Sequence, residues 1–111
     1  MARLNYVELP VQDIAATKSF YESAFGWSLA QFGPTYAATT SGDTDIGLQA
    51  DASEATRAPL QVIDVDDLER ALEAVISAGG SVTRPIFAFP GGRRFQFLDP
   101  SGNEIAAVKA G

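Results

Sequence analysis

Apolar and polar residues follow two different periods in the first quarter of this chain of 111 residues. Leu4 to Val11 alternates with the two-residue period of a strand. Asp13 then offers an N-cap for a helix that begins at Ile14, and apolar residues recur at helical spacing as far as Gly26. A glycine at that position often ends a helix in the left-handed conformation. The pattern therefore predicts a strand, a turn and a helix.

Short strands separated by turn residues are predicted next. They cover Trp27–Phe32, Tyr36–Thr40 and Asp45–Gln49. The stretch Ala50–Ala58 is small and polar and is the best candidate for a linker.

The same order of elements then returns. Leu60–Val65 reads as a strand, Asp66 and Glu69 have the spacing of a capping box, and a helical pattern runs to Gly79 and Gly80. The remaining predicted strands are Ser81–Ile86, Arg94–Leu98 and Glu104–Val108.

The two halves of the chain are a duplication, with Val11 matching Val65. We therefore predict an α+β fold made of two βαβββ modules, residues 1–50 and 59–111, within one domain of residues 1–111. The modules are expected to form a curved, incompletely closed, eight-stranded mixed sheet around a cavity, with the helices on the outside. Each half is too short to bury a comfortable core alone.

Composition narrows the classes of partner. The net charge is −6, and basic residues cluster only at Arg93 and Arg94. Nucleic acids and anionic membrane surfaces both demand a basic face, so neither is an expected partner. The first residues lack the pattern of a signal peptide and no apolar run approaches membrane-spanning length, so we expect a cytoplasmic protein. A small molecule or a protein, including a second copy of the chain, is the expected partner.

Several short sequence motifs, in the order in which they occur along the chain, resemble those of the vicinal oxygen chelate superfamily. This superfamily includes glyoxalase I, bleomycin-resistance proteins and extradiol dioxygenases. The motifs are residues 7–13 (VELPVQD), 20–27 (FYESAFGW), 91–95 (GGRRF) and 98–105 (LDPSGNEI). The last two are similar to a subgroup described as related to lactoylglutathione lyase. The resemblance covers nearly the whole chain.

The resemblance also implies where a metal ion would be held in metal-dependent members. Its four ligand positions fall on Tyr6, Gly47, Leu60 and Ala106. Three of these side chains cannot ligate a cation, neutral tyrosine is a poor ligand, and histidine and cysteine are absent from the chain. We therefore predict no metal and no cofactor. A Mg²⁺ or Ca²⁺ site built from carboxylates alone is left open, although such sites need several converging oxygens.

Candidate ligand-binding residues follow from strand faces and from the family positions. Tyr6 and Glu8 share one strand face and are also the candidate proton-transfer pair. Arg94 is a candidate clamp for an anionic group, whereas Arg93 is expected to pair with a surface carboxylate. The full predicted binding set is Tyr6, Glu8, Gln49, Leu60, Val62, Asp64, Arg94, Phe95, Glu104 and Ala106.

Three functions remain open from the sequence. The first is metal-free binding of a small aromatic or amphiphilic molecule in the sheet cavity. The second is a metal-independent lyase or isomerase that uses Tyr6 and Glu8 for proton transfer. The third is a structural or regulatory homodimer without a ligand. Nucleophilic catalysis of the Ser-His-Asp or Cys-His type is excluded, because there is neither histidine nor cysteine.

Overall fold

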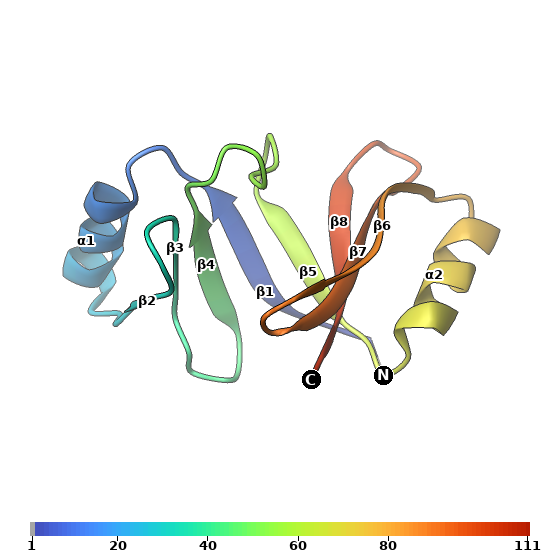
Figure 1. Ribbon diagram of the computed structural model, residues 1–111, viewed down its shortest axis with the longest axis horizontal. Helices are drawn as coiled ribbons and strands as arrows, with labels where there is room; N and C mark the ends of the chain where they lie inside the picture. The colour runs from blue at the N-terminus through green and yellow to red at the C-terminus, as the bar shows by residue number, and fades with distance from the viewer. Residues whose placement is uncertain (1) are drawn as a thin grey trace. The chain divides into compact units, whose positions relative to one another are not determined.

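The computed structural model describes residues 2–111 and divides them into two compact units. One unit holds residues 6–60, and the other holds residues 2–5 together with residues 61–111. Each unit carries one α-helix and a set of strands, coloured in chain order in Figure 1. The order of elements is the same in both halves of the chain, as the duplication predicts.

The unit of residues 6–60 combines parallel and antiparallel pairing. Its strands lie in the order β2-β3-β4-β1, in which β1 and β4 are parallel and the other pairs are antiparallel. The elements are β1 (Arg3–Pro10), α1 (Ile14–Phe25), β2 (Ala30–Gln31), β3 (Tyr36–Ala38) and β4 (Asp45–Gln49).

Helix α1 begins and ends at the residues that the sequence predicts. The carboxylate of Asp13 accepts a hydrogen bond from the amide of Ala16 at 2.9 Å, which satisfies one of the helix's first N–H groups. Gly26 adopts a left-handed backbone with φ 71°, and its amide donates to the carbonyl of Glu22. Both predicted helix boundaries are confirmed.

One face of this sheet packs against α1. The buried cluster consists of Leu29, Ala37 and Leu48, with Leu9, Val11, Ile14 and Tyr21 packed on it. Because side chains alternate along a strand, the residues next to Leu9 and Leu48 in sequence point to the opposite face. Tyr6, Glu8 and Gly47 therefore share the face that α1 does not cover.

The second unit repeats this plan with longer strands. Its strands lie in the order β5-β8-β7-β6, with β5 and β8 parallel and the other pairs antiparallel. Its core under α2 consists of Leu68, Phe95 and Ala107. The elements are β5 (Leu60–Asp64), α2 (Leu68–Ser77), β6 (Ser81–Phe89), β7 (Gly92–Leu98) and β8 (Glu104–Ala110).

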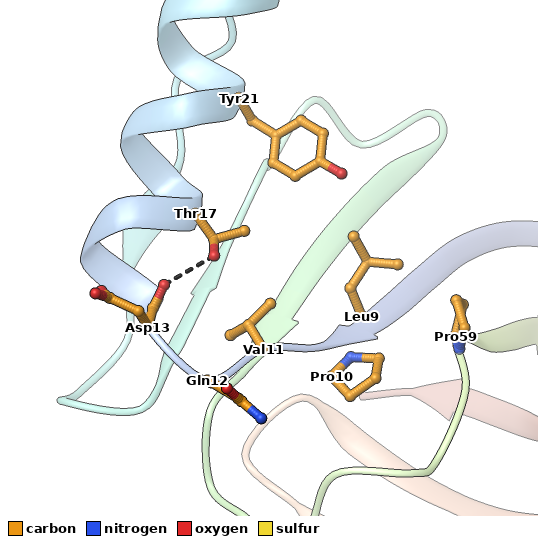
Figure 2. A pocket seen from close by; sticks show the side chains of 8 residues that line it. All are labelled: Leu9, Pro10, Val11, Gln12, Asp13, Thr17, Tyr21 and Pro59. Atoms are coloured by element: carbon orange, nitrogen blue, oxygen red, sulfur yellow. Dashed lines mark hydrogen bonds between the residues drawn. The ribbon is translucent and has the colours of Figure 1, made fainter.

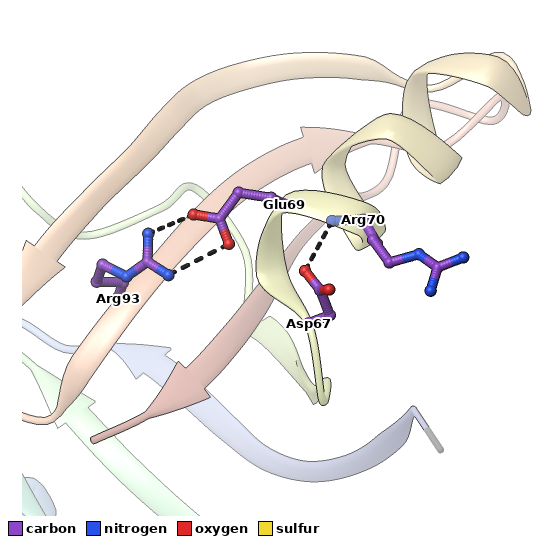
Figure 3. Close-up of polar contacts among 4 residues, drawn as sticks. All are labelled: Asp67, Glu69, Arg70 and Arg93. Carbon is purple, nitrogen blue, oxygen red and sulfur yellow. Dashed lines mark hydrogen bonds and ion pairs between the residues drawn. The ribbon is translucent and has the colours of Figure 1, made fainter.

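The predicted capping box of α2 is wrong by one residue. Asp67, and not Asp66, is the N-cap, and its carboxylate accepts from the amide of Arg70 at 3.1 Å. The carboxylate of Glu69 instead accepts hydrogen bonds from both terminal nitrogens of Arg93, at 2.6 and 3.3 Å (Figure 3). The expected pairing of Arg93 with a surface carboxylate is confirmed.

Several predicted strands have different lengths in the structure, two of them by three residues or more. Of the predicted strand Trp27–Phe32 only Ala30–Gln31 is a strand, and Trp27 stacks on Tyr21 of α1 instead. Strand β6 runs three residues past its predicted end to Phe89, since the backbone stays paired with β7 up to the turn at residues 90–91.

The predicted α+β class, with eight strands in mixed pairing and two helices among residues 2–111, is confirmed. Neither unit closes its own strands into a barrel. Within residues 2–111, no helix combines the length and the apolar character that crossing a bilayer demands.

Candidate functional site

Two tyrosines and a glutamate meet on the uncovered sheet face of residues 6–60. The hydroxyl oxygens of Tyr6 and Tyr36 lie 2.5 Å apart, and the Tyr36 hydroxyl donates to Oε2 of Glu8 at 3.0 Å. A hydroxyl group has one hydrogen, so the bond between the tyrosines is donated by Tyr6. The result is a directed chain of hydrogen bonds from Tyr6 through Tyr36 to Glu8.

The backbone of β4 leaves the space in which this chain forms. Gly47 lies beside Glu8 on one side and Ala38 on the other. A Cβ atom placed on Gly47 would overlap the hydroxyl oxygens of both Tyr6 and Tyr36. The absence of a side chain at Gly47 is therefore what allows the two phenol rings to converge.

Burial strengthens the electrostatics of this cluster. Glu8 is only 5% exposed, although it carries a carboxyl group. Burial raises the pKa of Tyr36 far above its ordinary value, and the charge of Glu8 and the neighbouring Tyr6 raise it further. Tyr36 thus stays a protonated hydrogen-bond donor at neutral pH.

The unit of residues 61–111 carries its own row of polar side chains on the face away from α2. Gln96, 5% exposed, accepts from Arg94 at 3.3 Å and donates to Glu104 at 3.0 Å. The same oxygen of Glu104 accepts from the hydroxyl of Thr83 at 2.8 Å. The row crosses β7, β8 and β6 and holds the Glu104 carboxylate and the Gln96 amide in a defined orientation.

Aromatic rings flank the arginine end of this row. The guanidinium of Arg94 lies 5.3 Å from the ring centre of Phe87 and 5.7 Å from that of Phe89. Arg84 stacks more closely on Phe87, at 3.7 Å. The pairing of Phe87 with Arg94 across β6 and β7 produces this arrangement.

The remaining residues predicted to bind a ligand include some that share a sheet face with these polar side chains, such as Ala106, the register partner of Gln96, and one that does not. Phe95 is fully buried in the core under α2, on the opposite face of β7 from Arg94. Gln49 lies next to Tyr36 on the paired strand, but its side-chain oxygen accepts from the amide of Asp51 in the following turn. Leu60, Val62 and Ala106 are buried apolar residues, and Asp64 is half-buried.

The sequence interpretation missed the contribution of Tyr36 and Gln96. The role of Tyr36 depends on the antiparallel register that places it beside Gln49, two residues from Gly47, and this register has no local signal in the sequence. Gln96 had a local signal, since it lies two residues after Arg94 on the same strand and therefore on the same face.

An open groove of about 480 Å³ lies apart from these polar clusters, between the end of β1 and the first turns of α1 (Figure 2). Tyr21 points its ring toward Leu9 there, and the Thr17 hydroxyl is engaged by the carbonyl of Asp13 at 2.8 Å. The groove is lined by Leu9, Pro10, Val11, Gln12, Asp13, Thr17, Tyr21 and Pro59. No residue of the predicted binding set lines this groove.

Comparison with known proteins decides the family. The model of the Glyoxalase/Bleomycin resistance protein/Dioxygenase superfamily matches residues 3–107, nearly the whole chain. The chain belongs to this superfamily. Putative glyoxylase CFP32 of Mycobacterium tuberculosis and of Mycobacterium bovis is 29% identical over 117 aligned residues, covering 96% of this chain. The chain spans 45% of the length of these curated relatives.

Solved structures of other superfamily members share the fold. A superfamily member from Vibrio splendidus matches with a TM-score of 0.72 at 19% identity, covering 99% of both chains. Methylmalonyl-CoA epimerase from Mycobacterium tuberculosis matches with a TM-score of 0.76 at 18% identity, over 97% of this chain and 87% of the epimerase. The Mn(II)-bound glyoxalase from Novosphingobium aromaticivorans matches at 0.71 and 20% identity, over 98% of this chain and 40% of the glyoxalase.

The residues of this superfamily member do not fit the transition metal that the resemblance implies. Two of the implied ligand positions are Tyr6 and Gly47, and the Tyr6 and Tyr36 hydroxyls fill the space over Gly47. The other two are Leu60 and Ala106, which have no donor atom. Among residues 2–111, no three acidic, histidine or cysteine side chains cluster where they would bind a metal ion.

Proposed function

We propose that this chain is a metal-free member of the superfamily that binds a small organic molecule on the sheet face carrying Tyr6, Tyr36 and Glu8. The directed hydrogen-bond chain over Gly47 is the observation that supports it most. A buried carboxylate and two phenols in fixed positions orient a ligand by a few polar contacts, as small-molecule sites do. The superfamily fold supports the proposal but does not name the ligand.

The direction of the chain restricts the ligand's chemistry. Tyr36 donates its hydroxyl hydrogen to Glu8, and Tyr6 donates its hydroxyl hydrogen to Tyr36. Toward a ligand, the Tyr6 oxygen can therefore act only as a hydrogen-bond acceptor. A ligand that binds there supplies a hydroxyl or amine hydrogen, and its flat apolar part stacks on the phenol rings. Small phenols and other hydroxylated aromatics fit this description.

The test is a thermal-shift screen of small phenols and aromatic alcohols, followed by calorimetry on each compound that raises the melting temperature. We expect Tyr36→Phe to weaken binding by roughly 10-fold, because the Tyr36 hydroxyl takes part in both hydrogen bonds of the chain. Tyr21→Phe is the matched control, since Tyr21 lies in α1 and lines the groove of Figure 2.

Three results of this screen would contradict the proposal. They are no binding by any compound, equal affinity in the Tyr36→Phe variant, or a loss of affinity confined to Tyr21→Phe. The last result would place the ligand in the groove instead.

A second function is favoured by the same chain of hydrogen bonds. A proton taken from a ligand by the Tyr6 oxygen releases the Tyr6 hydrogen to Tyr36, and the Tyr36 hydrogen then moves to Glu8. Reversal on another atom of the ligand completes a metal-independent isomerisation without net gain or loss of protons. Deuterium uptake from D₂O into a bound ligand, followed by NMR, tests this step. Uptake that is unchanged in Glu8→Gln and Tyr6→Phe would exclude it.

A further inference from the structure

We propose that Tyr6, Tyr36 and Glu8 form a redox site, in which Tyr36 gives one electron to an organic radical while its hydroxyl proton moves to Glu8. The substrates are one-electron oxidants of the class of peroxyl and phenoxyl radicals. All three residues belong to the unit of residues 6–60. This activity differs from ligand binding and from isomerisation. It requires no bound ligand, so its test uses the chain alone and its failure leaves the ligand proposal unaffected.

The carboxylate of Glu8 supplies the proton acceptor that oxidation of a phenol requires. A phenol that loses an electron becomes a strong acid, and its oxidation is slow unless a nearby base takes the proton. Tyr36 donates its hydroxyl hydrogen to Oε2 of Glu8 at 3.0 Å, a distance over which a proton transfers directly. Because Glu8 is only 5% exposed, bulk water has little access to this base.

Tyr36 keeps its hydrogen until it is oxidised. Burial raises the pKa of Tyr36 far above its ordinary value, and the charge of Glu8 raises it further. The resting state is therefore a neutral phenol hydrogen-bonded to a carboxylate. In this state the proton stays on Tyr36, and it crosses to Glu8 only as the electron leaves. Electron and proton therefore depart together.

The second tyrosine stabilises the radical that results. Tyr6 donates its hydroxyl hydrogen to the Tyr36 oxygen at 2.5 Å, and this bond is retained when Tyr36 becomes a neutral radical. An electron and a proton that pass together from Tyr6 to Tyr36 move the radical to Tyr6 and restore the Tyr36 hydroxyl. Both side chains are half-buried, which limits coupling between radicals on different molecules.

The step balances when the oxidant is a peroxyl radical. One electron leaves Tyr36 and reduces the peroxyl radical to a hydroperoxide anion, which takes a proton from water. The O–H bond of Tyr36 breaks, and its proton forms an O–H bond with the carboxylate of Glu8. The products are a hydroperoxide, a hydroxide ion, a tyrosyl radical and a protonated glutamate. Each copy of the chain thus removes one oxidant.

The second copy of the repeat shows that the fold does not require a carboxylate at this place. Val62 of β5 is equivalent to Glu8 of β1, because the repeat that matches Val11 with Val65 shifts both by the same distance. Val62 is buried and pairs with Ala106 of β8, just as Glu8 pairs with β4. Burial of a carboxylate costs free energy that burial of a valine does not. The carboxylate of Glu8 is therefore better explained by chemistry than by packing.

Tyr21 provides a comparison within the same unit. The chain has three tyrosines, and Tyr21 is the one outside the hydrogen-bonded group. Its ring stacks on Trp27 at 5.5 Å between ring centres. It lines the groove of Figure 2, where none of the other lining residues, all of which the structure describes, forms a hydrogen bond with its hydroxyl. When Tyr21 is oxidised, it must therefore release its proton to water or buffer.

The test is oxidation by tris(bipyridine)ruthenium(III) generated with a laser flash, with the tyrosyl radical followed by its absorbance and by electron paramagnetic resonance. All variants carry Trp27→Phe, which removes the competing tryptophan. Tyr21→Phe then leaves only the hydrogen-bonded pair, and Tyr6→Phe/Tyr36→Phe leaves only Tyr21. We expect the pair to be oxidised about 100-fold faster than Tyr21, the lower end of what a positioned base contributes. The rate for the pair should not depend on buffer concentration, whereas the rate for Tyr21 should rise with it.

Removal of the base gives the second arm of the test. We expect Glu8→Gln to lower the oxidation rate of the pair to that of Tyr21. Glu73→Gln removes one charge at an exposed position of α2 and should leave the rate unchanged. If Glu8→Gln does not fold, the buffer dependence of the pair decides the question. Equal rates for the pair and Tyr21, a shared dependence on buffer, or an unchanged rate in folded Glu8→Gln would overturn the proposal.

Discussion

At the scale of single residues, Gly47 leaves the space in which two tyrosines and a glutamate meet. The hydroxyls of Tyr6 and Tyr36 meet over it, and any larger residue would displace them. The Tyr36 hydroxyl then reaches Glu8, which is almost fully buried. One missing side chain thus converts two separate phenols and a carboxylate into a connected group.

Tyr36 makes the stability of the chain sensitive to alkaline pH. Burial, then the charge of Glu8 and the neighbouring Tyr6, raises the pKa of Tyr36 above its ordinary 10.0. The folded state therefore holds this proton more tightly than the unfolded state does. The stability from this difference is fully present below about pH 10 and is lost as the pH rises above that value.

We expect Tyr36→Phe to lose less stability than the native chain between about pH 9 and pH 11 in urea titrations. The phenolate absorbance of the native chain should show Tyr36 ionising only when the chain unfolds. Ionisation of Tyr36 near its ordinary pKa in the folded chain would refute this expectation.

At the scale of elements, the two helices begin with the same kind of cap but bury different side chains. Asp13 and Asp67 each bond the amide three residues further on, so both helices begin by the same local rule. The faces differ, because α2 places the fully buried Leu68 in its core while α1 exposes Phe20 and Phe25.

The cap of α1 predicts a measurable loss of stability. Asp13→Ala removes the bond to the amide of Ala16 and should cost about 1 kcal/mol of unfolding free energy. Asp13→Asn keeps an acceptor oxygen in the same place and should cost much less. Urea unfolding of both variants measures the difference, and equal losses would show that the cap itself contributes little.

At the scale of the whole molecule, composition limits the chemistry that the superfamily fold can support. The chain has neither histidine nor cysteine, which are the side chains that transition-metal sites in proteins favour. The curated relatives are more than twice as long as the part that this chain matches. Their activity is therefore no guide to the chemistry of these 111 residues.

Elemental analysis of protein purified without chelator tests the metal-free proposal. We expect zinc, nickel, iron and manganese to stay well below one ion per chain after dialysis, because Leu60, Ala106 and Gly47 offer no side-chain donor. Stoichiometric metal that survives dialysis would contradict this expectation, and with it the proposed metal-free binding site.

Local signals in the sequence determined much of the architecture. Strand periods, the Asp13 cap and the Gly26 end of α1 depend on residues close in sequence, and the duplication repeats them. The same local reasoning placed Arg93 on the surface with a carboxylate partner. It misplaced the cap of α2 by one residue, because Asp66 and Asp67 are neighbouring residues of the type that caps helices well.

The tertiary structure alone decided which side chains meet. Tyr36 joins Tyr6 and Glu8 because β3 pairs with β4 and β4 with β1 in one particular register. Phe95 shares a strand with Arg94 but belongs to the core, because α2 covers its face of the sheet. Backbone preferences act between neighbours along the chain, whereas strand register and burial are set by contacts between residues far apart in sequence. The order of elements could therefore be predicted from the sequence, and the composition of the site could not.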